Sequence, residues 1–375
     1  EISCSLVGSE MCIRDRYLDF TYYKTDSRNQ ILKLATTAAS GYTSQVRNAG
    51  HIRNRGYEIQ LGAVPIQTSK GFRWNLDLNY GANSSKVVKL DDEGLITSYQ
   101  LYSSGIQILA SVGEAYGTLF GTSYVRDANG NVVVDANGLP KISTTNKTLG
   151  KFTPDWTGGI SNTFSYRSLS LSFLIDASVG GSIFSNTNKT GKYTGVLANT
   201  LSGRDAEHGG LWYYTDAMGN NVRLSESPSY SVSSDGLYYA QVNGQSTRVY
   251  QDGIMVEGVT ESGSKNEEVV SAEKYYHRIY SIAEANVYDA SYVKLREVAL
   301  SYRLPRLWTQ KLHLQEASVT LTGRNLWTIY KSVPNIDPES ALTTGNAQGV
   351  EAYSLPTTRS LSLIHISEPT RLQLI

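Results

Sequence analysis

The stretch VYDASYVKLREVALSYRLP, residues 287–305, contains the pattern that decides the fold. In its second half, apolar residues alternate with small or polar ones: Val298, Leu300, Tyr302 and Leu304 against Ala299, Ser301 and Arg303. Strict alternation is typical of a β-strand with two unlike faces. The alternation changes phase between Leu295 and Val298, which predicts a β-bulge. Pro305 has no backbone N–H, so it fits the end of a strand at a sheet rim.

The same period of two recurs in residues 57–63, 73–80 and 168–175. Segments of about 8–12 residues match tilted strands that cross a bilayer, whereas the strands of soluble sandwiches are usually nearer 5–6 residues. The sequence therefore predicts an all-β fold, an antiparallel transmembrane β-barrel. A secreted, soluble β-sandwich that binds carbohydrate is the alternative.

Residues 73–80 predict which face of the sheet meets lipid. A membrane barrel turns apolar side chains outward and polar ones toward its lumen. We therefore expect one set of side chains on the lipid side: Trp74, Leu76, Leu78 and Tyr80. The alternate set is expected to face the lumen: Arg73, Asn75, Asp77 and Asn79.

The composition excludes several classes of protein. The 375 residues carry 34 Lys and Arg against 34 Asp and Glu, so there is no excess positive charge for a nucleic-acid binder. No run approaches the ~18 apolar residues of a membrane-spanning helix. Tyrosine is abundant, with 26 Tyr against 7 Phe and 5 Trp. An apolar ring with a polar tip suits interfaces, sugar-binding faces and the aromatic belts of membrane barrels.

The two ends differ from the rest of the chain. Residues 1–16 hold both cysteines, and residues 362–375 are out of register with what precedes them. Both strings resemble translated read-through of sequencing adapters, with a native tail as the alternative. We expect them to be non-native and to pair with nothing, which leaves 17–361 as the native part. That part has no cysteine, which excludes disulfides and thiol chemistry.

The connections are expected to come in two sizes. Residues 127–130 and 135–138 both read Asp-Ala-Asn-Gly, a signature of tight hairpin turns. The alternative, a calcium loop starting at Asp127, lacks the required Gly at position 6 and Glu at position 12. Residues 180–287 form a long connection rich in Ser, Gly, Asn and Tyr. Membrane barrels carry long loops outside and short turns inside, so we expect this connection to be extracellular.

Catalytic chemistry is not indicated. No nucleophile elbow, phosphate loop, dinucleotide fingerprint or metal-ligand spacing occurs, so we expect neither an enzyme nor a cofactor. Glu267, Glu268 and Glu273 could form a glycosidase pair, but such charge runs are usually solvated loops. Clustered aromatic residues are candidate contacts to a ligand or partner, with packing between loops or an aromatic girdle as the alternative: Trp212, Tyr213, Tyr214, Tyr238 and Tyr239.

Residues 287–305 resemble a hallmark near the C-terminus of SusC/RagA-type TonB-dependent transporters. Residues 321–327, 337–339 and 353–360 resemble the next features of that family in order, and residues 54–58 and 150–159 resemble earlier ones. The resemblance covers nearly all of 17–361. It marks these signature residues, with an expected structural role: Asp289, Ala290, Ser291, Leu295, Arg296, Pro305, Asn325, Leu326, Asp337 and Pro338.

The resemblance implies part of a Bacteroidetes outer-membrane barrel that imports oligosaccharides or peptides. We expect roughly ten strands of a barrel that has about 22, surrounded by outer-membrane lipid. A SusD-like surface lipoprotein is the expected partner, and TonB would act through an N-terminal part with a plug and TonB box, absent here. By itself such a chain would not transport.

Overall fold

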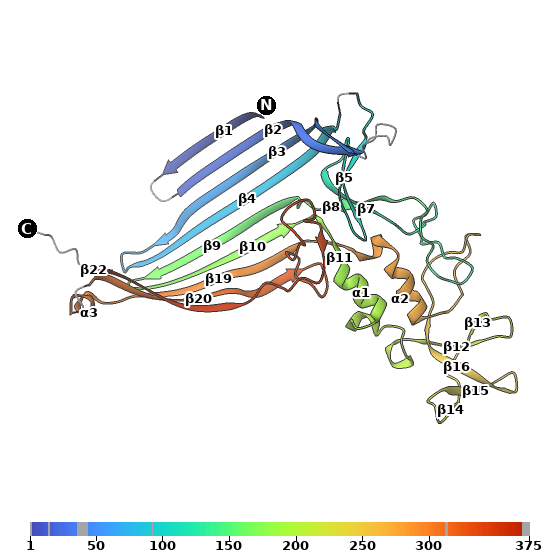
Figure 1. The fold of residues 1–375 in the computed structure, drawn as a ribbon. Helices are drawn as coiled ribbons and strands as arrows, with labels where there is room; N and C mark the ends of the chain where they lie inside the picture. Colours follow the sequence, from blue (N-terminus) through green and yellow to red (C-terminus); the bar gives the residue numbers. More distant parts are fainter. Residues whose placement is uncertain (1, 14–15, 36–43, 92, 312–313, 370–375) are drawn as a thin grey trace, which may run out of the picture.

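The computed structural model describes residues 2–13, 16–35, 44–91, 93–311 and 314–369. Its main feature is a large antiparallel sheet, here called the wall, with strand order β1-β2-β3-β4-β9-β10-β19-β20-β22 among the described residues (Figure 1). The strands are β1 (Ile2–Ile13), β2 (Arg16–Ala35), β3 (Ser44–Gln67), β4 (Phe72–Lys89), β9 (Trp156–Tyr166), β10 (Leu169–Val179), β19 (Tyr292–Arg303), β20 (Leu314–Lys331) and β22 (Ser360–Pro369). Nine strands are close to the roughly ten expected.

Several wall strands are longer than the expected 8–12 residues. β2 has 20 residues, β3 has 24 and β4 has 18. The apolar alternation of β4 stops near Tyr80, but its pairing with β3 continues to Lys89. Beyond the alternating residues, these strands therefore continue through backbone pairing alone. Alternation in the sequence does not predict that additional length.

The register separates apolar from polar side chains on the two faces of the wall. One row of directly paired residues is entirely apolar: Leu18, Leu61, Leu78, Ile160, Ile175, Leu295 and Trp327. A second apolar row on the same face is Trp74, Phe164, Leu171, Leu300, Leu321 and Leu363. A row on the opposite face is polar: Arg73, Ser165, Ser170, Ser301 and Thr320. The period-two pattern thus continues across strands as well as along them.

A polar side chain on the apolar face has a partner within the sheet. Asn162 pairs with Leu76 in the register and is buried. Its amide oxygen accepts a hydrogen bond of 3.0 Å from the indole N–H of Trp74. This bond lowers the cost of placing an amide among apolar neighbours.

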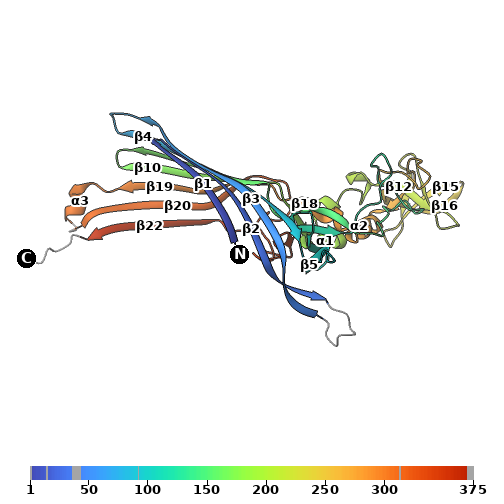
Figure 2. The same cartoon turned by 90° about the horizontal axis from the view of Figure 1, so that it is seen from above.

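Long and short connections lie at opposite ends of the wall (Figures 1 and 2). At one end, residues 68–71 join β3 to β4, and residues 167–168 join β9 to β10. The short helix α3 (Arg306–Lys311) lies between β19 and β20 at the same end. At the other end are residues 90–155, 180–291 and 332–359, here called the loop region.

The expectation that both chain ends pair with nothing is wrong. β1 pairs with β2 from Ile2 to Ile13, and β22 pairs with β20 from Ser360 to Pro369. The outer edge of a sheet presents unpaired N–H and C=O groups, which an adjoining extended segment can pair with. Residues 360–363 also alternate Ser and Leu, so they match the pattern of the wall. The non-native origin of residues 1–16 and 362–375 stays a prediction.

The loop region contains regular structure that alternation did not predict. Residues 90–155 carry a sheet of β5 (Ser98–Ser103), β6 (Gln107–Ser111), β7 (Tyr116–Gly121) and β8 (Lys147–Lys151). A small sheet joins β11 (Ser182–Ser185), β18 (Val287–Asp289) and β21 (Val350–Glu351). A third consists of β12 (Leu211–Thr215), β13 (Asn221–Arg223), β14 (Tyr230–Val232), β15 (Tyr238–Val242), β16 (Gln245–Ile254) and β17 (Val270–Ser271).

Two helices of the loop region begin at serine caps. The Ser185 side chain accepts from the N–H of Asn188 at the start of α1 (Asn186–Thr194), and Ser271 does the same for α2 (Ala272–Tyr280). α1 ends at Gly195, whose φ of 68° suits a residue without a Cβ. None of the helices in the described part of the chain is long and apolar enough to cross a membrane.

Candidate functional site

The predicted β-bulge lies at Arg296, where the wall meets the loop region. The register of β19 against β20 shifts between Leu295 and Glu297, and the register of β10 against β19 shifts at the same level. Arg296 is the extra residue. The side chains of Arg296 and Glu297 both lie on the polar face of the wall, where they bond Asp176 and Arg324 respectively. Leu295 remains in the apolar row. The prediction of a bulge from the change of phase is confirmed.

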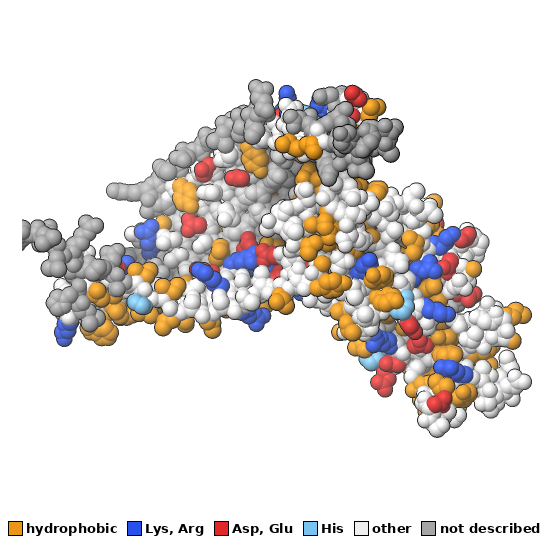
Figure 3. Space-filling model, in the orientation of Figure 1, with side chains coloured by type: hydrophobic (Ala, Val, Ile, Leu, Met, Phe, Trp, Pro, Cys, Tyr) orange, Lys and Arg blue, Asp and Glu red, His pale blue; other side chains and the backbone are white. Residues whose placement is uncertain are grey.

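Around this bulge lies an ionic cluster, defined as Asp176, Tyr292, Lys294, Arg296, Asp337 and Glu339. Lys294 Nζ lies 2.6 Å from both Asp337 Oδ1 and Glu339 Oε2. Arg296 donates to Asp176 Oδ2 at 2.7 Å and to both carboxylate oxygens of Glu339. The Lys294 side chain is 3% exposed, and its two carboxylate partners compensate the cost of burying it. Figure 3 shows acidic and basic side chains meeting on the wall beside its junction with the loop region.

The cluster fixes the charge of the two loop carboxylates. Burial alone would raise the pKa of Asp337, but hydrogen bonds from Lys294 and Thr357 outweigh it and lower the pKa to about 2. Burial likewise opposes ionisation of Glu339, and bonds from Arg296 and Lys294 lower its pKa to about 2. Both groups are therefore anions at neutral pH. The cluster fastens residues 332–359 to β10 and β19.

The other signature residues also make hydrogen bonds or packing contacts within the fold. Asp289 Oδ1 accepts from the Ser291 N–H at 2.7 Å, and Ser291 Oγ accepts from the Gly180 N–H at 2.8 Å. Ala290 packs against a small core of the loop region. Pro305 follows β19, which ends at Arg303, and its carbonyl accepts from the Trp308 N–H in α3. These contacts hold the ends of wall strands in place.

Asn325, Leu326 and Pro338 lie close to the junction of wall and loop region. Asn325 has a φ of 52°, and its side chain donates to the Thr358 carbonyl at 3.2 Å. Leu326 occupies the space above Gly323, where a Cβ would come within 3.0 Å of it. Pro338 lines a cavity of about 280 Å³ beside Lys294. These three signature residues thus lie at the junction of wall and loop region, whereas Pro305 lies at the opposite end of the wall.

The predicted aromatic contacts divide into two groups. Trp212 and Tyr213 are buried in the sheet of the loop region, which favours the alternative of packing over direct ligand contact. Trp212 lies 5.1 Å from the Tyr230 ring, and Tyr213 stacks on Tyr250 at 5.0 Å. Three remain half-buried: Tyr214, Tyr238 and Tyr239.

The two Asp-Ala-Asn-Gly segments are tight turns, as predicted. The Asp127 carboxylate accepts from the N–H groups of Asn129 and Asn131, and Asp135 accepts from Asn137 and Leu139. These bonds use the carboxylates to hold their own turns. Among the described residues, no group of three or more His, Cys, Asp or Glu side chains is placed to hold a metal ion.

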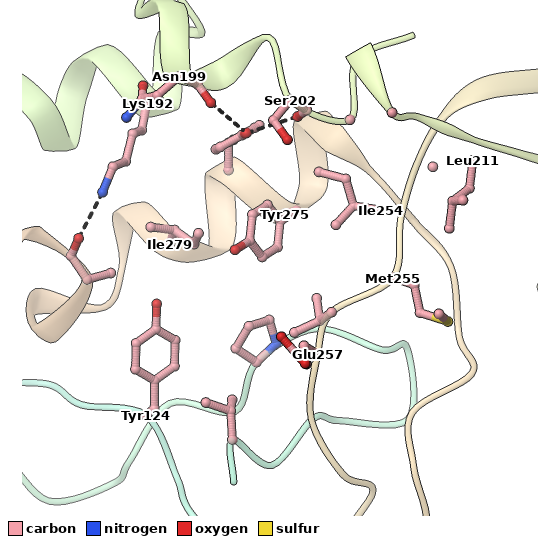
Figure 4. A pocket seen from close by; sticks show the side chains of 18 residues that line it. Tyr124, Lys192, Asn199, Ser202, Leu211, Ile254, Met255, Glu257, Tyr275 and Ile279 are labelled. Carbon is pink, nitrogen blue, oxygen red and sulfur yellow. Dashed lines mark hydrogen bonds between the residues drawn. The ribbon is translucent and has the colours of Figure 1, made fainter. Parts of the chain in front are cut away.

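A cleft of about 720 Å³ lies among the segments around α2 (Figure 4). Tyr275, Tyr276 and Ile279 line it from α2, and Tyr124 and Lys192 line it from other segments. The Tyr276 hydroxyl donates to the Asn199 carbonyl at 3.1 Å or to the Ser202 carbonyl at 3.0 Å, so its proton is used in hydrogen bonding within the protein. The sequence indicated this site only through the adjacent pair Tyr275-Tyr276, an aromatic cluster of the kind that can stack on sugar rings. The other walls come from distant segments and were not predicted.

Comparison with known proteins agrees with this architecture. TonB-dependent receptor P3 of Formosa agariphila is 25% identical over 95% of this chain, and receptor P26 of the same organism is 24% identical over 92%. The chain is homologous to TonB-dependent receptors. It spans about a third of the length of these curated relatives, 33% and 32%. No protein-family model matches it.

Solved structures show the same fold. The RagAB peptide importer in its closed-closed state superposes with a TM-score of 0.55 at 18% identity, covering 94% of this chain and 33% of that one. The RagAB peptide transporter gives 0.56 at 19% identity, with the same coverage. These likenesses confirm the expected SusC/RagA resemblance and the all-β fold class, that of part of a β-barrel. The homologues carry the names of receptors, not enzymes.

Proposed function

We propose that this chain forms part of the barrel wall and the outer loops of a TonB-dependent importer in the outer membrane of a Bacteroidetes-type bacterium. The observation that carries the proposal is the combination of a two-faced wall with long connections at one end. The apolar face lies against lipid, and the polar face lines the lumen. A soluble sandwich would cover its apolar face with a second sheet, whereas Leu169 and Leu321 on that face are 46% and 49% exposed.

Aromatic side chains support the lipid assignment. Near the short turns, Trp74 stacks on Phe164 at 5.7 Å, and toward the loop region Tyr80 lies 5.5 Å from Trp156. The six residue steps from Trp74 to Tyr80 span roughly 20 Å along the strand. Barrels carry an apolar band of about 25 Å between two aromatic girdles. These two groups fit the two girdles of such a band.

The loop region is proposed to be extracellular and to receive the cargo and a SusD-like lipoprotein. Short turns at the other end fit the periplasmic side of a barrel. The cargo class is an oligosaccharide or a peptide; RagAB is named a peptide importer. Capture would occur at the loops, and the polar face of the wall would border the path inward. TonB would act through a segment outside these 375 residues, and no covalent chemistry is required of this chain.

Deleting residues 205–265 from the full-length protein tests the proposal. This removes most of the third sheet of the loop region but leaves every wall strand. We expect capture of the lipoprotein and import to fall at least tenfold, while heat-modifiability of the barrel on gels is retained. The matched control replaces α3, at the opposite end of the wall, with a short turn and should leave capture unchanged. An intact barrel that still binds its lipoprotein and imports after the deletion contradicts the proposal.

A further inference from the structure

The cleft beside α2 contains two phenols without partners. Tyr124 and Tyr275 turn their oxygens toward one another across the hollow (Figure 4). Tyr124 is held by its backbone N–H, which donates to Glu284, and Tyr275 by an edge-on contact with the Tyr276 ring. Within the described residues, neither phenol oxygen has a hydrogen-bond partner. Burial raises the pKa of both, so each hydroxyl is neutral and able to donate and accept.

The charged groups of the cleft disfavour an anionic ligand. Lys192 donates to the Ala285 carbonyl at 2.8 Å and to Asn286 Oδ1 at 3.2 Å, so it is engaged within the fold. Burial lowers the pKa of Lys192 to about 8, which weakens it further as a fixed cation. Glu257 is exposed on the lining and accepts hydrogen bonds only. An anionic ligand beside Glu257 would find no free cation in the described lining of the cleft to pair with.

Part of the remaining lining is apolar, and Asn199 and Ser202 add polar groups to it. Ile254, Met255 and Ile279 supply a surface on which the apolar face of a ring can rest. One recurring mode of peptide binding adds a strand to a free sheet edge. Here α2 and connecting segments form most of the lining instead. The volume of about 720 Å³ is in the range of small-ligand sites.

We infer that the cleft binds a neutral saccharide of one or two rings, with its hydroxyls bonded to Tyr124, Tyr275 and Glu257. This inference rests on the proposed function and deepens it by naming the cargo class and a capture site outside the wall. Sugar hydroxyls both donate and accept, so they satisfy the two phenols at once and donate to the carboxylate.

Binding to the full-length protein in detergent tests this site. The probes are an array of neutral and acidic di- to tetrasaccharides and of tripeptides, followed by calorimetry with the strongest neutral saccharide. Tyr124→Phe and Tyr275→Phe should each weaken binding about three- to tenfold, because each removes one hydrogen bond. Tyr280→Phe, on the same helix and outside the cleft, should leave the Kd unchanged. Ile279→Trp should fill the cleft and abolish binding.

Three outcomes overturn the inference: no neutral saccharide binds, only acidic saccharides or peptides bind, or the two Phe variants and Ile279→Trp bind like the unsubstituted protein. Lipoprotein capture and import are measured on the same preparations. If they persist while the cleft variants have no effect, the saccharide site is wrong and the proposed function stands. If import is absent from the unsubstituted protein as well, the proposed function fails.

Discussion

The wall and the loop region are held together in different ways. In the wall, neighbouring strands pair along most of their length, and each residue faces its partner in a regular register. In the loop region, contacts join residues that are far apart in sequence, such as Glu351, which accepts from Ser185 and Thr187 at 2.7 and 2.6 Å. The wall therefore depends on a repeated pattern, and the loop region depends on individual side chains.

The largest expected effect lies where the two regions meet. Glu339→Ala removes the carboxylate shared by Lys294 and Arg296 and leaves two partly buried cations short of a partner. We expect a loss of about 3–5 kcal/mol in the free energy of unfolding, measured by urea titration of the full-length protein in lipid bilayers. Glu297→Ala is the control, because its pair with Arg324 is exposed and should contribute about 0–1 kcal/mol. Equal losses for both would mean that the ionic cluster does not fasten the loop region.

Acid should loosen the same junction while the wall stays paired. The pKa values of Asp337 and Glu339 are about 2, below their ordinary values of 3.8 and 4.5. Their contribution to stability is therefore complete above about pH 4.5 and is lost as the pH falls toward 2. Hydrogen exchange should show residues 332–359 opening in this window before the central wall strands. Uniform opening of both regions would contradict the comparison.

A glycine in the wall should be intolerant of a side chain. A Cβ on Gly62 would lie 1.8 Å from the Tyr17 ring, which crosses it to donate to Asp77 at 3.0 Å. Gly62→Ala should therefore displace Tyr17 and cost about 1–3 kcal/mol. Gly81→Ala is the control, since its nearest neighbours would be 3.9 Å away, and it should be neutral. The same unfolding titration measures both, and equal costs would remove this explanation.

The smallest expected effect is at Asn325. Its φ of 52° is in the left-handed region, and its side chain bonds the Thr358 carbonyl. Asn325→Ala should cost about 1–2 kcal/mol through backbone strain and the lost bond. Asn325→Gly should recover the strain part, because glycine adopts positive φ freely. An alanine variant as stable as the glycine variant would show that strain is not stored there.

The wall was more predictable from the sequence than the loop region. Parts of β3, β4, β10 and β19, the bulge at Arg296 and the separation of apolar from polar residues were predicted, because alternation is a local property of the chain. The pairing of β1 and β22 was missed, because the edge of a sheet accepts a segment through backbone groups that carry no sequence signal. For the aromatic candidates the sequence left ligand contact and packing open, because burial of Trp212 depends on Tyr230 and Tyr238 in other strands.

The loop region was largely unpredictable for a physical reason. Its helices begin at serine caps, but their positions depend on long-range bonds such as those of Glu351 and of Asn286, which donates to the Ile279 and Ile282 carbonyls. The cleft is assembled from segments around Tyr124, Lys192 and Tyr275, and no period in the sequence connects them. Most of the residues marked by the family resemblance lie at the junction of wall and loop region, and none lines this cleft.

The central claim is that one face of the wall lies against lipid, and paired arginine substitutions at one depth test it most directly. Leu76 is in the apolar face and Asn75, the next residue, is in the polar face. In the full-length protein refolded into lipid vesicles, Leu76→Arg should reduce the free energy of unfolding by about 2–4 kcal/mol. Asn75→Arg should change it by less than about 1 kcal/mol, because its side chain meets water in the lumen. A large loss for Asn75→Arg with none for Leu76→Arg would contradict the assignment of the two faces.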